Sequence, residues 1–201
     1  MTTLLQIKTS INHPQGQSSQ LADRFIAAFL RRHPETKVAV RDVAKADPIP
    51  HLDGERFAAF VTPAESRSRT QEATVAYSDR LIDELRQADI IVLGLPMYNF
   101  GIPSQLKAYF DHIARVGVTF KYTEAGPVGL LVGKRVVVFA TRGGHYAGTP
   151  LDTQTGYVRD FLRFVGITDV EFVYAEGLNI SPQSKAAGLA KAEAEIERLA
   201  A

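Results

Sequence analysis

The sequence predicts an α/β protein in which a parallel sheet is covered by helices on both faces. Five short apolar runs, rich in β-branched residues, alternate along the chain with five longer stretches of helical periodicity. Such regular alternation is typical of right-handed βαβ units, so we expect a doubly wound, five-stranded parallel sheet. The run at 89–96 is apolar throughout, which indicates a central strand that is buried on both faces.

The elements follow one another in a simple order. The short apolar runs predict strands at 4–10, 37–43, 89–96, 134–141 and 169–177. The amphipathic stretches predict helices at 18–33, 70–88, 103–116, 156–166 and 182–200. Thr70 suits the N-cap of the second helix, Pro103 the first turn of the third, and Gly166 the end of the fourth.

Two stretches fall outside this alternation. Residues 44–69 contain several prolines and a glycine, and we interpret them as a long surface excursion. Residues 118–134 contain a Gly-Pro pair between two short apolar pieces, which indicates a hairpin or flap inserted before the fourth strand of the sheet.

Composition narrows the class of protein. A chain of 201 residues suits one domain over 1–201 that buries a sizeable core. The net charge of +1 gives no reason to expect a nucleic acid or a membrane surface as partner. The absence of cysteine excludes disulfides, thiolate nucleophiles and Cys-ligated zinc. No signal-peptide pattern and no apolar run of roughly 18 residues is present, so we expect a cytoplasmic protein.

Ligands of open α/β sheets bind beyond the carboxyl ends of the strands, where the strand order reverses. The loop after the first strand contains Ser10, Gly16, Gln17 and Ser18 and then opens a helix. Free backbone N–H groups at a helix start, together with small hydroxyls, can hold a phosphate. The alternative is that Ser18 only caps the helix. No G-x-G-x-x-G fingerprint and no nucleotide P-loop is present.

The loops after the third and fourth strands differ from the first loop, because they offer apolar side chains and glycines to a ligand. Residues 96–104 combine apolar side chains with an asparagine amide, which suits a flat ligand that is partly apolar and partly hydrogen-bonding. Gly143 and Gly144 would allow close approach of the backbone to such a ligand. Arg142 is interpreted either as an anion contact or as a solvated charge.

The stretch "PMYNFGIPSQLKAYFDHIARVGVTFKYTEAGPVGL", followed by "TRGG", resembles the FMN-dependent, NAD(P)H-using azoreductases and quinone oxidoreductases of bacteria. The likeness covers nearly the whole chain, and "MYNF" is its most specific part. The resemblance implies a flavodoxin-like fold with strand order 2-1-3-4-5. It also implies a homodimer with one FMN per subunit near the interface.

The resemblance assigns residues to the cofactor and to the substrate. The FMN phosphate would contact Ser10, Gly16, Gln17 and Ser18. The isoalloxazine ring would be bordered by Pro96, Met97, Tyr98, Asn99 and Phe100 and by Thr141, Arg142, Gly143 and Gly144. The substrate would contact Phe120 and Tyr122 of the flap and Phe164 of the partner subunit. Gly16 and Thr141 depart from the family, in which serine is frequent at both positions.

The implied reaction transfers two electrons from NADH or NADPH through FMN to quinones and aromatic azo compounds. Because both substrates would approach the same ring face, we expect them to bind in turn, in a ping-pong mechanism. The chemistry belongs to the cofactor, so no catalytic side chain and no metal is expected. The sequence leaves open the choice between NADH and NADPH, the physiological acceptor and the role of His145.

Two alternatives come from other classes. A hydrolase would need a nucleophile or a metal, but the sequence has no G-x-S-x-G and no H-E-x-x-H, and its five histidines are scattered. A flavodoxin-type electron carrier would use the same loops, but such carriers are typically strongly acidic. This chain is near neutral and carries the extra flap and excursion, which suit an enzyme that shelters a small substrate.

Overall fold

The structure, a computed structural model, describes residues 1–45 and 49–200. Its centre is a parallel five-stranded sheet of order β2-β1-β3-β6-β7. This is the order 2-1-3-4-5 that was expected, once the two hairpin strands are left out of the numbering. The sheet consists of β1 (Thr3–Lys8), β2 (Lys37–Asp42), β3 (Ile90–Pro96), β6 (Arg135–Thr141) and β7 (Asp169–Ala175).

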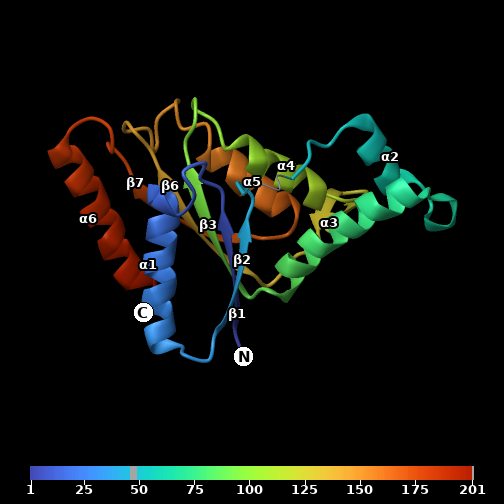
Figure 1. Cartoon of the computed structure of the whole chain (residues 1–201), viewed down its shortest axis with the longest axis horizontal. Coiled ribbons are helices and arrows are strands. Elements are labelled where there is room, and N and C mark those ends of the chain that lie inside the picture. Colours follow the sequence, from blue (N-terminus) through green and yellow to red (C-terminus); the bar gives the residue numbers. More distant parts are fainter. Residues whose placement is uncertain (46–48, 201) are drawn as a thin grey trace.

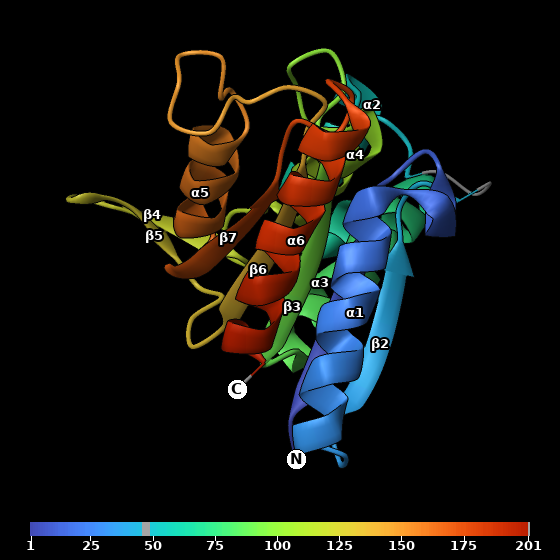
Figure 2. The same ribbon diagram turned by 90° about the vertical axis from the view of Figure 1, so that its left-hand side faces the viewer.

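Helices cover both faces of the sheet, as Figures 1 and 2 show. Each face has its own apolar cluster, because successive side chains of a strand point to opposite sides. Leu4 and Phe139 contribute to the cluster under the first helix layer, and Leu5 and Val138 to the cluster under the second. The first layer is α1 (Gln17–Arg32) and α6 (Pro182–Leu199); the second is α3 (Arg69–Gln87), α4 (Ser104–Ile113) and α5 (Thr155–Phe164).

Most element boundaries agree with the sequence-based expectation to within two residues, and the exceptions have local causes. The expected cap at Thr70 is wrong. Ser68 is the N-cap of α3, in a capping box in which its hydroxyl accepts from Gln71 N and its own N–H donates to the Gln71 side chain. Helix α4 ends at Ile113, three residues early, because the following segment turns toward the hairpin.

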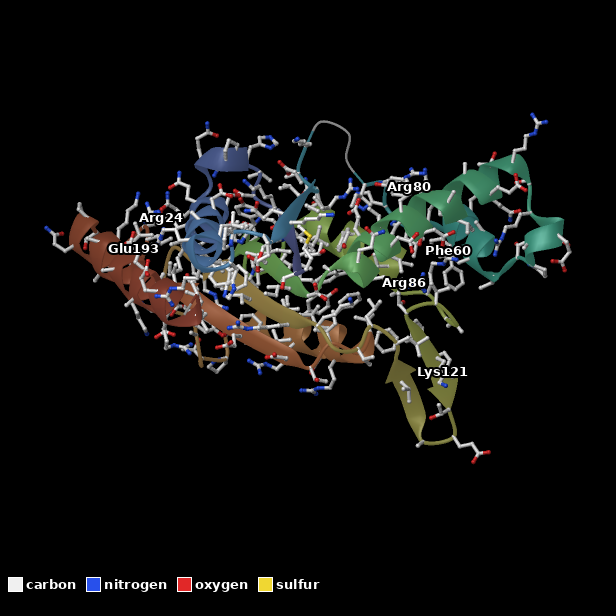
Figure 3. All side chains as sticks on the ribbon, turned by 90° about the horizontal axis from the view of Figure 1, so that it is seen from below. Arg24, Phe60, Arg80, Arg86, Lys121 and Glu193 are labelled. Carbon is white, nitrogen blue, oxygen red and sulfur yellow. The ribbon has the colours of Figure 1, made fainter. Side chains whose placement is uncertain are left out.

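The surface excursion at 44–69 is more ordered than expected. It contains α2 (Gly54–Val61) and a short 3-10 helix (Ala64–Ser66), while residues 46–48 lie outside the described part of the chain. Asp53 caps α2 by accepting from Arg56 N at 2.8 Å. Figure 3 shows the helical part of this excursion at one end of the molecule, with Phe60 labelled.

The expected hairpin is confirmed as β4 (Phe120–Thr123) paired antiparallel with β5 (Gly126–Gly129). Its Gly-Pro pair begins the returning strand instead of forming the turn, because Thr123 already pairs with Gly126. The base is packed closely on the end of α5: a Cβ added at Gly129 would lie 2.0 Å from Gly166 N. The remainder projects from the body of the protein, with Lys121 visible in Figure 3.

The short 3-10 helix His13–Gln15 completes the regular structure of the loop after β1. Across the described residues, none of the helices is both long and apolar enough to cross a membrane.

Candidate functional site

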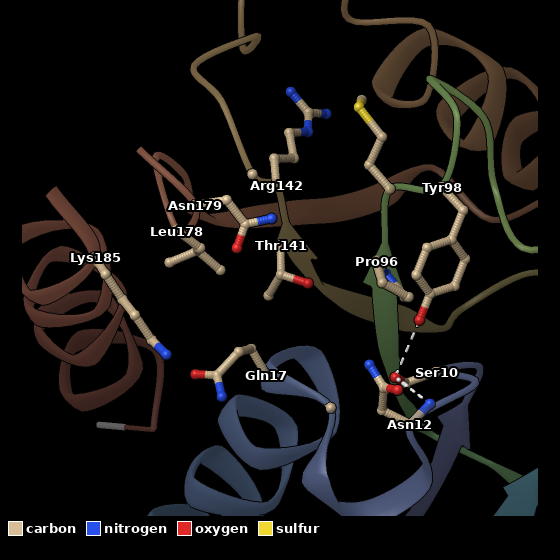
Figure 4. Close-up of a pocket in the computed structure, with 13 residues that line it drawn as sticks. Ser10, Asn12, Gln17, Pro96, Tyr98, Thr141, Arg142, Leu178, Asn179 and Lys185 are labelled. Atoms are coloured by element: carbon tan, nitrogen blue, oxygen red, sulfur yellow. Dashed lines mark hydrogen bonds between the residues drawn. The ribbon is translucent and has the colours of Figure 1, made fainter. Parts of the chain in front are cut away.

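The loops that follow β1, β3, β6 and β7 meet at the carboxyl edge of the sheet and enclose a cleft (Figure 4). The cavity volume of the cleft is about 160 Å³. Its lining residues are Ser10, Asn12, Gly16, Gln17, Pro96, Met97, Tyr98, Thr141, Arg142, Gly143, Leu178, Asn179 and Lys185. The three loops singled out from the sequence therefore do converge.

The start of α1 has no cap of its own. Its N-cap is Gly16, which makes no side-chain hydrogen bond, and its first turn holds no acidic residue. The backbone N–H groups of that turn are therefore available to an external acceptor. A Cβ added at Gly16 would lie 2.1 Å from Ser10 Oγ and 2.6 Å from Ser10 Cβ, so the loop is closed too tightly for a side chain here.

Ser18 does not cap the helix, so that interpretation is wrong. Its side chain is 1% exposed, and its Oγ, like that of Ser19, has no hydrogen-bond partner among the described residues. The hydroxyl lies near β3, where a Cβ added at Gly94 would be 3.5 Å from it. Ser18 can therefore offer the cleft a backbone N–H more readily than a hydroxyl.

Tyr98 links the first loop to the loop after β3. Its hydroxyl lies 3.2 Å from Ser10 Oγ and accepts from Ile11 N at 3.2 Å, and Ser10 Oγ in turn accepts from Asn12 N at 3.2 Å. Figure 4 shows the contacts of Ser10 with Tyr98 and with Asn12 along one side of the cleft. The ring of Tyr98 therefore forms part of the wall, and its hydroxyl holds the first loop in place.

The segment from Tyr98 to Gly101 is a tight reverse turn with two left-handed residues. Tyr98 N donates to Gly101 O at 3.1 Å and Gly101 N donates to Tyr98 O at 2.9 Å, while φ is 49° at Asn99 and 62° at Phe100. A type I′ turn requires this pair of positive angles and usually takes Asn-Gly. A left-handed backbone costs phenylalanine about 1–3 kcal/mol, so Phe100 adopts its conformation at the expense of stability.

The turn presents Phe100 outward. The ring is 48% exposed and meets Tyr146 edge to face, with 5.5 Å between the centroids. Asn99 and Phe100 line a shallow groove next to the cleft instead of the cleft itself, together with Ile102, Lys107 and Tyr157. Only the first part of the M-Y-N-F motif therefore faces the main cleft.

Gln154 fixes this turn from behind. It is fully buried, and its Nε2 donates to Pro96 O and to Gly101 O, both at 2.9 Å. Thr153 adds a hydroxyl bond to Phe100 O. The segment before α5 thus holds the wall of the cleft at three carbonyl groups.

Arg142 is neither a solvated charge nor a free anion contact. Its side chain is buried, with Nη2 2.6 Å from Asp152 Oδ1 and 3.1 Å from Thr155 Oγ1, and Nη1 3.2 Å from Glu176 Oε1. Figure 4 shows the guanidinium turned away from the centre of the cleft. Arg142 therefore contributes to the wall of the cleft, while its charge is compensated within the chain.

The carboxylates around Arg142 also hold backbone. Asp152 accepts from Thr155 N at 3.1 Å, at the start of α5, and Glu176 accepts from Tyr146 N and Ala147 N, each at 2.8 Å. Burial raises the pKa of Asp152, but the hydrogen bonds from Arg142 and Thr155 outweigh this and hold the pKa below its ordinary value. The carboxylate is therefore ionised at neutral pH.

The glycines after β6 have different neighbours. Gly143 lines the cleft, and a Cβ there would lie 2.8 Å from Asn179 Nδ2. Gly144 is not among the lining residues, and a Cβ there would lie 2.7 Å from the Tyr146 ring. Thr141 is nearly buried at the end of β6 and contributes to the floor of the cleft.

The three residues expected to contact substrate lie together elsewhere on the chain. Phe120 is 5% exposed and packs on Phe164 with 4.2 Å between the ring centroids, while Tyr122 lies 5.5 Å from Phe120 and is 69% exposed. None of the three lines the cleft of its own chain. Within one chain they form the base and the projecting face of the hairpin.

Asn12 belongs to the first loop that the sequence singled out, whereas three lining residues after β7 were missed: Leu178, Asn179 and Lys185. Lys185 is in α6, and the segment between β7 and α6 bonds to the loop after β6: Leu178 N donates to Arg142 O at 3.1 Å and Asn179 N to Gly143 O at 3.0 Å. The rule that sites lie at carboxyl ends of strands applied to β7 as well and was the available signal. His145, in contrast, is exposed and lines a separate hollow beside α6.

The arrangement fits a flat cofactor with a terminal phosphate. The uncapped start of α1 and the close Gly16 turn leave room for an anion, and Pro96, Met97, Tyr98 and Gly143 offer a smooth wall for a ring. Among the described residues there is no group of three or more metal-ligating side chains. Fold and site together are those of an open α/β protein with a cleft that suits a phosphorylated, flat ligand at the carboxyl edge of its sheet.

Comparisons with known proteins agree with this class. The family profile described as flavodoxin-like fold matches residues 2–200. A protein of Cellvibrio japonicus (strain Ueda107) named FMN-dependent NADH:quinone oxidoreductase is 57% identical over 197 residues, covering 98% of each chain. A protein of Burkholderia lata named FMN-dependent NADH:quinone oxidoreductase 6 is 56% identical over 196 residues, again covering 98% of each chain.

Solved structures give the same result. The azoreductase from Bacillus anthracis str. Sterne has a TM-score of 0.91 and 30% identity over 100% of this chain and 99% of that chain. An FMN-dependent NADH-azoreductase from Bacillus anthracis str. Ames Ancestor, in complex with FMN, has a TM-score of 0.88 and 26% identity over 100% and 98% of the two chains. The chain therefore belongs to the flavodoxin-like family, within the group of FMN-dependent NADH:quinone oxidoreductases and azoreductases.

Proposed function

We propose that this protein is an FMN-dependent oxidoreductase that transfers two electrons from NADH to quinones and aromatic azo compounds. The single observation that carries the proposal is the cleft itself, in which an uncapped helix start and a flat wall lie side by side. The names of the relatives that match over nearly the full chain support the reaction class.

The phosphate of FMN would be held at the start of α1. The backbone N–H groups of Gln17 and Ser18 are free to donate there, and the helix dipole favours an anion by about 0.3–1 kcal/mol, up to about 2 when partly buried. Ser10, Asn12 and Gly16 shape the loop around this position. Gly16 has no hydroxyl to offer, so backbone groups contribute a larger share of the donors.

The ring would rest against the loops after β3 and β6. Pro96, Met97 and Tyr98 border one edge of it, and Thr141, Arg142 and Gly143 border the other. Asn99, Phe100 and Gly144 lie just outside this wall, where the rim would meet a substrate. When bound, FMN accepts a hydride and passes on two electrons, while these residues orient it and limit access of water.

Donor and acceptor would occupy one slot in turn. The loop walls close one side of the bound ring, and both substrates would use the side that remains open. Steady-state lines at several fixed acceptor concentrations are therefore expected to be parallel, the ping-pong pattern. Intersecting lines, together with a ternary complex detected by titration, would show that both substrates fit at once.

A homodimer would complete this open side. In one chain the hairpin exposes Tyr122 and Val128, and Val132 just after it is also exposed. Phe120 and Phe164 pack together and do not line the cleft of their own chain. We propose that Phe120, Tyr122 and Phe164 of one protomer lie over the cleft of its partner. Phe164→Ala would then raise the acceptor KM more than it slows flavin reduction. A 22.0 kDa monomer with full activity in light scattering would contradict this arrangement.

The identity of the cofactor is tested by release. Heat-released flavin is expected to co-migrate with FMN on chromatography, because the cleft offers an anion site at α1 and the sequence has no adenosine fingerprint. Stopped-flow reduction by NADH and by NADPH compares the two donors directly. Recovery of FAD, or of no flavin after reconstitution with FMN, would refute the proposed function.

A further inference from the structure

Helix α6 begins beside the start of α1, at the same edge of the sheet. The two helices run parallel (Figure 2), because Arg24 pairs with Glu193 and Arg31 with Glu197, in the same order along both helices. Figure 3 labels Arg24 and Glu193. The start of α6 is also held closely against the end of β7: a Cβ added at Gly188 would lie 2.2 Å from Glu176 O. Two helix N-termini therefore approach the cleft together.

Lys185 is the fourth residue of α6, and its side chain points into the cleft. Figure 4 shows its ammonium group directed toward Gln17, the first residue of α1. Within the described part of the chain, Lys185 forms no ion pair, and its side chain makes no hydrogen bond. Carboxylates near the two helices are engaged elsewhere: Asp23 with Lys8, Glu193 with Arg24 and Glu176 with Arg142.

This placement runs against the usual electrostatics of helices. The N-terminus of a helix carries partial positive charge, so anionic side chains are favoured there and cations disfavoured. Helices α2 and α3 follow that rule, with Glu55 and Glu72 in their first turns. Helices α1, α4, α5 and α6 have no acidic residue in their first turns. Lys107 near the start of α4 pairs with Asp111, whereas the exposed Lys185 near the start of α6 has no acidic partner among the described residues. Ser181 caps α6 by accepting from Ser184 N, but it does not compensate the charge of Lys185, which an anion bound in the cleft would do.

We propose that Lys185 is the counter-ion of the FMN phosphate held at the start of α1. This inference rests on the proposed function, since it names a further residue of the same site. The proposed phosphate site at the start of α1 has no hydroxyl at Gly16, and the Ser18 hydroxyl is turned toward β3. Few hydroxyl donors are therefore available to the phosphate. The phosphate carries nearly two negative charges at neutral pH, and the start of α1 has no cationic side chain for it. The ammonium group of Lys185 supplies that positive charge from α6.

The test compares two flavins that differ only in the phosphate. Apo-protein is titrated with FMN and with riboflavin, and the quenching of flavin fluorescence gives a Kd for each. For Lys185→Gln we expect the Kd of FMN to rise roughly ten- to hundredfold, as for the loss of a hydrogen bond to a charged group, with the Kd of riboflavin unchanged. Lys185→Arg keeps the charge and should retain most of the affinity for FMN.

Lys191→Gln is the matched control, because Lys191 lies on the same helix but lines the hollow beside His145. Its Kd for FMN should equal that of the wild type. The dependence of FMN affinity on salt concentration should also weaken in Lys185→Gln and not in Lys191→Gln, since one charge contact is lost.

The possible failures are distinguishable. If wild-type apo-protein binds no FMN, the proposed function fails and this inference fails with it. If the wild type binds FMN and Lys185→Gln binds it equally well, only the inference is overturned. An equal loss for FMN and riboflavin would mean a structural role, and a raised KM for NADH with unchanged FMN affinity would mean contact with the dinucleotide; either result overturns the assignment.

Discussion

Helices α1 and α3 begin in opposite ways. At α3 the first turn is closed by the chain itself, through the reciprocal bonds of Ser68 and Gln71 and a nearby Glu72. At α1 the N-cap is Gly16, no side chain accepts from the first turn, and no acid compensates the dipole. The start of α3 therefore has acceptors from its own chain, whereas the first turn of α1 leaves its backbone N–H groups to an external acceptor.

Helix α5 is an intermediate case that strengthens the contrast. Its start is near the cleft, but the acceptor is a carboxylate of the same chain, since Asp152 bonds Thr155 N and Thr155 Oγ1 while pairing with Arg142. Closeness to the cleft therefore does not by itself decide whether the first-turn N–H groups of a helix lack an acceptor within the chain. What distinguishes α1 is the absence of any acceptor near a cleft that also receives Lys185.

Removing the internal acceptor at α5 should have the largest effect on stability. Asp152→Ala leaves the buried guanidinium of Arg142 with one carboxylate fewer, and we expect a loss of about 3–5 kcal/mol in the free energy of unfolding. Denaturant unfolding of the apo-protein at pH 7 measures this. Asp83→Ala removes a mostly exposed pair with Arg86 and should cost no more than about 1 kcal/mol.

The same variant has a pH signature. The pKa of Asp152 is lower in the folded protein than in the unfolded chain, so its stabilising contribution is present above about pH 4 and is lost as the pH falls further. The stability difference between wild type and Asp152→Ala should therefore narrow on acidification. A difference that stayed constant from pH 7 to pH 3 would contradict this account.

A side chain at Gly16 should be the next most disruptive change. Its Cβ would overlap Ser10, so the loop must shift, and we expect Gly16→Ala to reduce apo-protein stability by about 1–3 kcal/mol and to weaken FMN binding. Gly156→Ala is the control, since its Cβ would have no neighbour within 4 Å and alanine suits a helix. Unchanged FMN affinity in Gly16→Ala would show that this turn does not shape the phosphate site.

Loss of the α3 cap should affect stability alone. Ser68→Ala should lower the free energy of unfolding by about 0.5–2 kcal/mol, because Gln71 N loses its acceptor, and should leave the Kd of FMN unchanged. Thr70→Ala, at the position where the sequence suggested the cap, should be nearly neutral. If Thr70→Ala were the more damaging of the two, the capping box would not be the feature that closes α3.

The smallest effect is expected at Ser18. Its hydroxyl is buried without a partner, so Ser18→Ala should change the free energy of unfolding by less than about 0.5 kcal/mol and the Kd of FMN by less than about threefold. Titration and denaturation of one variant give both values. A tenfold rise in Kd would mean that the hydroxyl turns to the phosphate when the cofactor binds.

The sequence predicted the sheet, its order and the inserted hairpin, because alternating apolar and amphipathic runs report on burial directly. It also placed three of the four loops that form the cleft. Helix starts were predicted less well: Thr70 was expected as a cap in place of Ser68, and Ser18 was offered as a cap where Gly16 stands. Serines and threonines next to a helix give similar local signals, and only the backbone geometry distinguishes them.

The charges of the site could not be predicted in the same way. Arg142 and Asp152 are ten residues apart and Glu176 is much further along the chain, so their ion pairs depend on how β6, β7 and α5 meet. Lys185 is one of eight lysines in the sequence, and the parallel packing of α6 on α1 brings it to the cleft. Contacts between residues that are distant in the sequence follow from the topology of the fold, so they cannot be predicted from the spacing of residues in the sequence.

Phe100 has a left-handed backbone, and we propose that its exposed ring meets the acceptor, so heat resistance and activity would make opposite demands on this position. Gly or Asn there would relax the turn and stabilise the fold, and at the same time remove the ring from the rim of the cleft. A laboratory evolution experiment that selected only for survival at high temperature would therefore be expected to enrich those substitutions. Selection for turnover of bulky aromatic acceptors would remove them again.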